Sequence, residues 1–327
     1  MMFTRRDFGK IALAALPAGK LLAKPDSKYG GVQIGIIISP VTFRDMPLPA
    51  DEILNNLVQL GISAVEMQDI RVEAYAGAPI GPRPKTPTRM AGSVPNQRPG
   101  RRARPTPEQL EERRKQAEEL QQWRISAPMD KYRALREMYR KAGVHMYAFR
   151  MASYNVNTPE AELAYYFNAA EALGADGITT ELPRDPELSK RLGEYAAKRK
   201  MMIGYHNHTQ VNFHSWDTAL AQSKYNGIQF DVGHYMAATS ESPIPFIQKY
   251  HERITNLHLK DRKSAKNGGQ NMPWGEGDTP LKQVLLMMRQ DRYKFPAGIE
   301  LEYHIPQGSS TMAEIGKCLK FCKDALA

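Results

Sequence analysis

Short apolar runs alternate with longer amphipathic runs from residue 30 onward. The apolar runs have the length and β-branched content of buried strands, and they lie at Val32–Ser39, Ala64–Met67, Val144–Met151, Gly177–Glu181, Met201–His206, Ile228–Asp231, Ile254–Leu259 and Ala297–Glu302. The amphipathic runs predict helices at Asp51–Leu60, Met129–Ala142, Pro159–Leu173, Glu187–Arg199, Trp216–Gln222, Pro243–Tyr250, Leu281–Arg289 and Met312–Leu326.

This strict alternation predicts a parallel sheet. Eight strand–helix pairs in about 300 residues favour a closed (β/α)8 TIM barrel over an open sheet. We therefore expect one catalytic domain over residues 30–327. In such barrels the active site lies at the C-terminal ends of the strands.

One segment breaks the alternation. Residues 78–107, after the second predicted strand, hold eight prolines and seven basic residues and little that is apolar. This composition cannot bury enough surface to fold alone, so we expect a solvated, mobile loop. A lid or a partner-binding arm is the alternative. Glu108–Arg124 then predicts a charged helix, so residues 78–128 form an insertion at the barrel mouth.

The first 24 residues have the layout of a signal peptide. Arg5 and Arg6 precede a short apolar run at Ile11–Leu16, and a charged segment before a short apolar one is typical of an export signal. The arginine pair is typical of the twin-arginine type. We expect a periplasmic or secreted protein with no membrane anchor after cleavage. An ordinary amphipathic N-terminal helix is the alternative.

The formal net charge of +10 is concentrated in two segments. Residues 1–24 hold five basic residues and one acid, and residues 79–107 hold seven basic residues and no acid. The rest of the chain is therefore near neutral, and the charge does not require a nucleic-acid partner. We expect a small-molecule partner instead, and the sequence leaves a homo-oligomer open.

The two cysteines predict no disulfide. Cys318 and Cys322 lie four residues apart in a helical pattern. They share a helix face, where two thiols are poorly placed for a disulfide. We interpret both as packing residues.

Polar side chains gather where the predicted strands end. They are Glu66, Glu181, His206, His208, Asp231, His234, His258, Lys260, Asp261, Glu300 and Glu302. Carboxylates mixed with imidazoles suit Mn, Mg, Co or Zn rather than a soft metal. The sequence therefore predicts one divalent metal ion at this rim, with Glu66 as a hydrogen-bond partner at the mouth.

Five short motifs carry a family resemblance. They are Tyr205–His208 (YHNH), Phe230–His234 (FDVGH), Leu257–Asp261 (LHLKD), Trp274–Asp278 (WGEGD) and Ile299–Tyr303 (IELEY). In this order and spacing they resemble the sugar phosphate isomerase/epimerase family, the xylose-isomerase-like barrels. The resemblance covers roughly residues 32–325, apart from the proline-rich insertion. It implies one divalent metal held by a Glu, an Asp, a His and a Glu on the late strands.

Residues of this chain match the last three metal ligands of the family. Asp231 and His258 match the family's motifs directly. Glu300 matches the final glutamate by spacing, with Glu302 as the alternate. Both point to one side of their strand, so we expect one to bind the metal and the other to pair with a lysine.

The first ligand departs from the family pattern. The family's first glutamate often lies on the fifth strand, where this chain has His206. We expect Glu181 on the neighbouring strand to supply the carboxylate. His206 is the alternative, and His234 is a further alternate ligand.

The resemblance implies proton abstraction next to a carbonyl of a sugar, through a metal-stabilised enediolate. Glu181 or Glu300 is the expected base. His206 and His208 are the reserves, expected to steer a hydroxyl group or act as acids, and Lys260 is a further candidate catalytic residue. Returning the proton gives isomerisation or epimerisation, and a leaving group beside the carbanion gives elimination, as in a 3-keto-glycoside lyase or hydratase.

Two other classes of protein remain open. A metal-free sugar-binding barrel would keep the fold without the chemistry. The related metal-dependent endonucleases that cut at abasic sites need several zinc ions and a basic groove, which the near-neutral body disfavours. An isomerase or epimerase is thus the principal prediction, with a carbon–oxygen lyase as the alternative.

The N-terminal pattern predicts an export phenotype. Replacing Arg5 and Arg6 together with lysine should hold the precursor in the cytoplasm, because the twin-arginine route reads the arginine pair. Cell fractionation with an antibody measures this. Normal export of the double variant would contradict the twin-arginine assignment.

Overall fold

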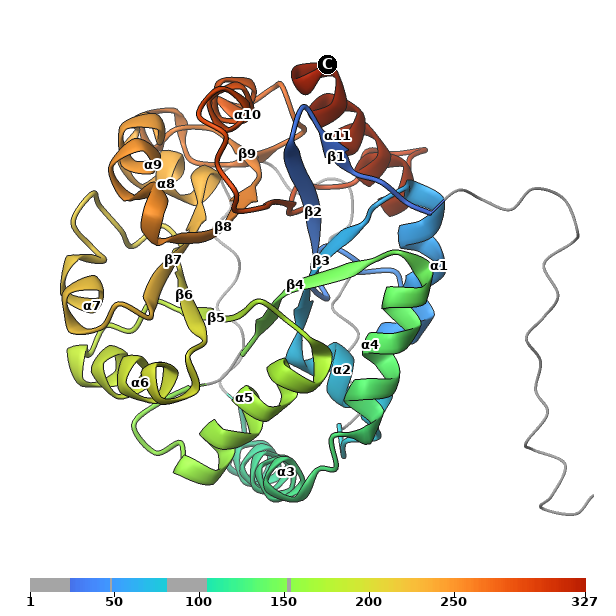
Figure 1. The fold of residues 1–327 in the computed structure, drawn as a ribbon, viewed down its shortest axis with the longest axis vertical. Coiled ribbons are helices and arrows are strands. Elements are labelled where there is room, and N and C mark those ends of the chain that lie inside the picture. The colour runs from blue at the N-terminus through green and yellow to red at the C-terminus, as the bar shows by residue number, and fades with distance from the viewer. Residues whose placement is uncertain (1–23, 48, 81–104, 152–153) are drawn as a thin grey trace, which may run out of the picture.

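Eight parallel strands close into a barrel, as predicted (Figure 1). The computed structural model describes residues 24–47, 49–80, 105–151 and 154–327. The barrel strands are β2 (Val32–Ile38), β3 (Ala64–Gln68), β4 (His145–Arg150), β5 (Gly177–Glu181), β6 (Met202–His206), β7 (Asn226–Asp231), β8 (Ile254–Leu259) and β11 (Ala297–Ile299). β2 pairs with both β3 and β11, and these pairings close the sheet.

A ring of helices covers the outside of the barrel (Figure 1). It consists of α1 (Ala50–Leu60), α4 (Asp130–Ala142), α5 (Glu160–Leu173), α6 (Pro186–Arg199), α7 (Asp217–Gln222), α9 (Ile244–Tyr250), α10 (Leu281–Gln290) and α11 (Thr311–Leu326). Among the described residues, no helix is both long enough and apolar enough to cross a membrane. Cys318 and Cys322 on α11 are free and buried, which confirms their packing role.

Several elements lie outside the alternating pattern. They are α2 (Asp69–Ala76), α3 (Pro107–Ser126), α8 (Val232–Thr239), β1 (Lys28–Tyr29), the short hairpin β9 (Asp261–Arg262) with β10 (Asn271–Met272), and single 3-10 turns at His251–Arg253 and Ala265–Asn267. α3 confirms the predicted charged helix.

The structure corrects two parts of the sequence prediction. The helices α2 and α8 were not predicted, because each is a single eight-residue run directly after a strand. The last barrel strand was predicted to reach Glu302 but ends at Ile299. The Glu300 amide still donates to the Leu259 carbonyl at 3.0 Å, and beyond it the chain leaves the sheet.

Two predictions fall mainly on residues outside the described ranges. The signal segment covers residues 1–24, of which only residue 24 is described, and the insertion loop includes residues 81–104. Both remain predictions.

Two glycines make room for a large side chain inside the barrel. A Cβ atom on Gly35 of β2 would lie 2.5 Å from a ring carbon of Tyr147, and one on Gly298 of β11 would lie 2.5 Å from its hydroxyl. Real Cβ atoms do not approach that closely, so these strand positions require glycine. The Tyr147 ring therefore fills the interior, near Glu66 and Glu300.

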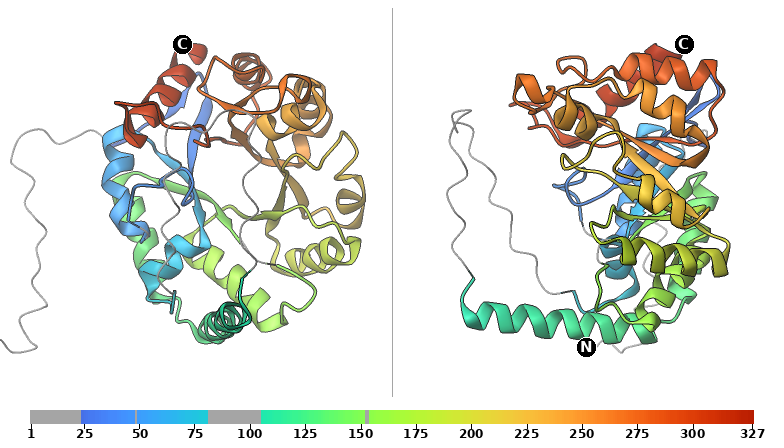
Figure 2. Two further views of the ribbon diagram at one scale, coloured as in Figure 1. Left: turned by 180° about the vertical axis from the view of Figure 1, so that it is seen from behind. Right: turned by 90° about the vertical axis from the view of Figure 1, so that its left-hand side faces the viewer.

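A buried ion-pair network attaches α3 to the barrel. Figure 2 shows α3 along the edge of the molecule with its N-terminal part projecting, while its C-terminal end meets α2 and α5. Arg124 Nε donates to Glu73 Oε1 at 2.7 Å, and its Nη1 donates to Glu162 Oε1 at 2.8 Å. Tyr165 also donates to Glu73 Oε1 at 3.0 Å. The inserted helix is therefore held at one end by a shared arginine.

Breaking this network should destabilise the fold. Arg124→Met leaves Glu73 and Glu162 buried without their cation, which costs roughly 3–5 kcal/mol when one partner of a buried pair is removed. Arg114→Met on the same helix removes only an exposed pair with Glu118, and should change stability by less than about 1 kcal/mol. Urea unfolding measures both, and equal effects would contradict the anchoring role.

Candidate metal and acid–base site

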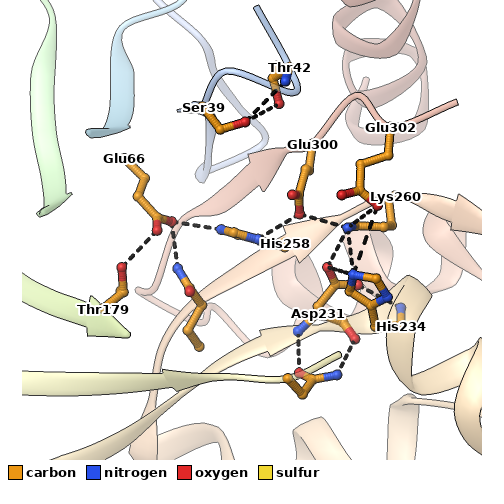
Figure 3. A network of polar contacts seen from close by, with 12 residues as sticks. Ser39, Thr42, Glu66, Thr179, Asp231, His234, His258, Lys260, Glu300 and Glu302 are labelled. Atoms are coloured by element: carbon orange, nitrogen blue, oxygen red, sulfur yellow. Dashed lines mark hydrogen bonds and ion pairs between the residues drawn. The ribbon is translucent and has the colours of Figure 1, made fainter. Parts of the chain in front are cut away.

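Glu66 on β3 is a fully buried carboxylate with four partners, of which Figure 3 labels Thr179 and His258. Thr179 Oγ1 donates to its Oε1 at 2.8 Å, and Gln229 Nε2 donates to its Oε2 at 2.6 Å. Asn256 Nδ2 and His258 Nε2 lie 3.1 and 2.7 Å from Oε2. Burial alone would raise the pKa of Glu66, but His258 outweighs it and the pKa lies below its ordinary value. Glu66 therefore stays ionised inside the barrel.

His258 on β8 lies between two carboxylates (Figure 3). Its Nε2 contacts Glu66, and its Nδ1 lies 2.8 Å from Glu300 Oε2. Burial alone would lower the pKa of His258, but these two carboxylates raise it to about 10. The ring is therefore an imidazolium in this arrangement. The Glu66 contact fixes the ring so that Nδ1 faces Glu300.

Lys260, two residues after His258, is the second buried cation. Its Nζ lies 3.0 Å from Asp231 Oδ2, 2.9 Å from Glu300 Oε2 and 2.8 Å from Glu302 Oε2. Burial would lower the pKa of Lys260, but the three carboxylates hold it above its ordinary value. Glu300 and Glu302, which follow β11, therefore both pair with the Lys260 ammonium. The sequence predicted that one of them would bind the metal and that only the other would pair with a lysine.

Asp231 uses its two oxygens for different purposes. Oδ1 accepts from the His234 amide at 2.7 Å and so caps α8, which leaves Oδ2 facing Lys260. Asn207 holds the Asp231 backbone, because its Oδ1 accepts from the Asp231 amide at 2.8 Å and its Nδ2 donates to the Asp231 carbonyl at 3.1 Å. Burial raises the pKa of Asp231, and Lys260 limits the rise.

His206 ends β6 and is 2% exposed. Its Nδ1 is buried and has no hydrogen-bond partner among the described residues. Burial, with Arg150 nearby, holds the pKa of His206 well below its ordinary value, so the ring is neutral. His206, Asp231 and His258 each offer one ligand atom, and these atoms lie within 4.8 Å of one another. The structure thus brings together a donor set suited to a divalent ion.

A second group of three ring nitrogens shares His206. His206, His208 and His234 also place one ligand atom each within 4.8 Å of the others. Two of these rings have other partners, since His208 Nε2 contacts Glu181 and His234 Nε2 lies 3.0 Å from Lys260 Nζ. Burial and the nearby ammonium hold the pKa of His234 below its ordinary value. A cation is less favoured here than beside Asp231.

Glu181 lies apart from the buried carboxylates, toward solvent. Its side chain is 44% exposed and pairs with Arg150, and His208 Nε2 lies 3.3 Å from Glu181 Oε1. Burial alone would raise the pKa of Glu181, but His208 and Arg150 hold it below its ordinary value. The hydrogen bond to Glu181 in turn raises the pKa of His208. Arg150 Nη1 also donates to Gln229 Oε1 at 2.8 Å, so it connects this pair to the interior.

Two of the sequence motifs serve the backbone around the site. Asp261 Oδ2 accepts from the amides of Gly275 and Gly277 at 2.8 and 3.0 Å, so it orders the loop after β10 rather than joining the charged cluster. A Cβ on Gly277 would lie 1.9 Å from Asp261 Oδ1. A Cβ on Gly233 would lie 2.4 Å from Lys260 Cγ. These glycines let the backbone approach the site closely.

The structure brings most of the predicted residues together. Asp231, His258, Lys260, Glu300 and Glu302 form one buried cluster with Glu66, and His206 borders it. The functional residues that sequence reasoning missed are Arg150, Thr179, Asn207, Gln229 and Asn256. Asn207 stands in the YHNH motif, which was its available signal. The others are single polar residues inside strands and carry no motif of their own.

Fold and site together define a class of protein. It is a (β/α)8 barrel whose C-terminal rim carries carboxylate and imidazole side chains within ligand distance of one another. More specifically, the chain belongs to the xylose isomerase-like TIM barrel family, which matches residues 95–323.

The chain is similar in sequence to enzymes named inosose dehydratase. An inosose dehydratase of Clostridium beijerinckii is 32% identical over 112 residues, which cover 32% of this chain and 34% of that enzyme. The match therefore spans about a third of the relative's length.

Solved structures of a probable dehydratase and of an epimerase share the fold. A probable 3-DHS dehydratase from Bacillus anthracis has a TM-score of 0.59 at 11% identity, covering 88% of this chain and 97% of that one. The 3-keto-D-glucoside 4-epimerase of E. coli has a TM-score of 0.55 at 11% identity, covering 90% and 99%. At this identity the structural similarities establish the fold alone.

The Glu181–His208 contact predicts a measurable pKa change. Glu181→Gln removes the carboxylate that stabilises the imidazolium, so the pKa of His208 should fall toward its ordinary value of 6.5. NMR titration of isotope-labelled histidine measures it. Glu187→Gln, on the exposed first turn of α6, is the control and should leave the value unchanged. An unchanged His208 in Glu181→Gln would rule out the pairing.

Proposed function

We propose that this protein is a divalent-metal-dependent enzyme that removes a proton next to the carbonyl of an unphosphorylated keto sugar, and acts as an isomerase or epimerase. The observation that carries the proposal is the set His206, Asp231 and His258, whose ligand atoms lie within 4.8 Å of one another. Membership of the xylose isomerase-like family supports this class of chemistry.

The residues present fit a divalent ion. Asp231 and Glu300 offer carboxylate oxygens, and His258 would offer Nδ1 after losing the proton from that nitrogen, because Glu66 engages its other nitrogen. His206 is neutral and has a buried Nδ1 without a partner among the described residues. Such an atom is costly to bury unless something binds it. We propose Asp231, His258 and Glu300 as ligands, with His206 as the fourth.

Glu181 is the other candidate for the fourth ligand. Its carboxylate is half exposed and already engaged by Arg150 and His208. This favours a different function, as an acid–base group at the solvent side of the site. Metal analysis of variants at Glu181 and His206 distinguishes the two assignments.

A divalent ion held by these ligands would stabilise the negative charge that develops on substrate oxygens when the neighbouring carbon loses its proton. Glu181 is ionised and can accept that proton. His208 has a raised pKa and can donate a hydrogen bond or a proton to a substrate oxygen. Arg150 holds the Glu181 carboxylate in place.

The charges around the site favour an uncharged substrate. Arg150 is paired with Glu181, and Lys260 with three carboxylates. Arg262 donates to the Gly269 carbonyl and contacts His234. None of these three cations offers an unpaired charge to a phosphate. This agrees with the expected export, because phosphorylated sugars are mostly cytoplasmic.

Elimination is the second candidate activity. The curated relatives are inosose dehydratases, which favours a lyase although the matches cover only part of those enzymes. A protonated His208 beside the base could protonate a leaving hydroxyl group. Inososes and 3-keto-glycosides are therefore the first substrates to test, together with free ketoses.

Metal analysis with proton exchange tests the proposal. Asp231→Ala and His258→Ala should lose the bound ion and all activity. Glu181→Gln should keep the ion but exchange substrate protons with deuterated water about 100-fold more slowly or worse, as expected for loss of a general base. His206→Ala should weaken metal binding if His206 is the fourth ligand.

His145→Asn is the matched control, since His145 is exposed at the opposite end of its strand and pairs with Asp176. It should behave as wild type in both assays. Full metal occupancy in Asp231→Ala and His258→Ala would overturn the proposed site. A wild-type protein with neither bound metal nor proton exchange would favour the metal-free sugar-binding barrel instead.

A further inference from the structure

Lys260 holds a position that a bound metal ion would also need. Its ammonium contacts Asp231 Oδ2 at 3.0 Å and Glu300 Oε2 at 2.9 Å. Both carboxylates belong to the proposed ligand set. Any cation bound through these two oxygen atoms must share them with Lys260 or displace it.

The burial of the cluster makes this competition strong. Lys260 is 2% exposed, and Asp231 is fully buried. Charges inside a protein are weakly screened, so two cations on the same oxygens repel each other strongly. Without a counter-charge, the buried carboxylates would be costly to keep ionised.

Lys260 has further neighbours that do not belong to the proposed ligand set. Glu302 Oε2 lies 2.8 Å from Nζ, and His234 Nε2 lies 3.0 Å away. A buried ammonium without partners would be prohibitive, but the Glu302 carboxylate remains available to Lys260. His234 is a weaker partner, because Arg262 donates to its Nδ1 and a neutral ring has only one acceptor nitrogen. The carboxylates can therefore exchange partners without leaving either cation unpaired.

We propose that the Lys260 ammonium is the resident counter-ion of this carboxylate cluster and competes with the divalent ion for Asp231 and Glu300. Lys260 stabilises the metal-free fold at the expense of metal affinity. The inference rests on the proposed metal site, and it assigns Lys260 a positioning role.

Binding of manganese alone to chelator-treated protein tests this role. In Lys260→Met the competing charge is gone, so calorimetry should show a manganese Kd at least about tenfold lower than in wild type, given the strength of charge–charge interactions at this separation. The metal-free Lys260→Met protein should melt at a lower temperature, and manganese should raise its Tm by more than it raises that of wild type.

Lys263→Met is the matched control. It removes the same charge from a lysine whose partners are Glu276 and Asp278 rather than the cluster, and it should leave both the manganese Kd and the Tm shift near wild type. An equal gain in affinity in Lys263→Met would overturn the inference, because a general charge effect would then explain the result.

A double variant covers the case in which Lys260→Met does not fold. Lys260→Met with Glu302→Gln removes one cation and one carboxylate together, and its manganese Kd should be lower than that of Glu302→Gln alone. If wild type binds manganese and the Lys260 variants show no lower Kd, this inference is overturned, but the proposed metal site is not. If neither wild type nor the Lys260 variants bind manganese, both proposals fail.

Discussion

Three buried carboxylates, Glu66, Asp231 and Glu300, gather with the partly buried Glu302 at one end of a closed barrel, and their mutual repulsion must be neutralised there. These side chains lie close together because the closed parallel sheet brings the C-terminal ends of all eight strands to one rim. His258 and Lys260 supply the counter-charge, and each bridges carboxylates from different parts of the chain. Removing either cation would leave buried anions that cost several kcal/mol each. The site is therefore also a part of the core that holds the rim together.

The site has two zones, which differ in how far their side chains are buried. The inner zone is buried, and its side chains are fixed by several contacts each, as the four partners of Glu66 illustrate. The outer zone is the Glu181–His208 pair, with side chains 44% and 50% exposed. Fixed groups suit the holding of a cation and of substrate oxygens. Half-exposed groups can exchange protons with solvent, which a proton-transferring pair must do between turnovers. Arg150 joins the zones by contacting both Glu181 and Gln229.

The sequence predicted the barrel and most of the charged cluster, since both leave periodic or ionic signals. The alternation of strands and helices predicted the fold, and the acids and histidines at the predicted strand ends pointed to Asp231, His258 and Glu300 as members of the cluster. Gln229 and Asn256 could not be found, because a neutral amide inside a strand has no distinguishing pattern. Arg150 gave no signal either, since a lone arginine near a strand end usually indicates solvent. Nor could the sequence show that Asp261 turns away from the cluster, because that depends on loop amides more than ten residues later.

The proposed site would suit either an epimerase or a dehydratase. Both reactions begin with loss of a proton beside a carbonyl, and they differ only in the fate of the resulting carbanion. Epimerisation needs a proton returned to the same carbon, whereas elimination needs an acid near a leaving hydroxyl. In the proposed mechanism His208 would be the group whose protonation state distinguishes these needs, because Glu181 raises its pKa and both side chains are accessible. In the proposed mechanism, the choice of reaction would therefore depend on which substrate oxygen is placed beside His208, and the outer zone rather than the buried ligands would set this placement.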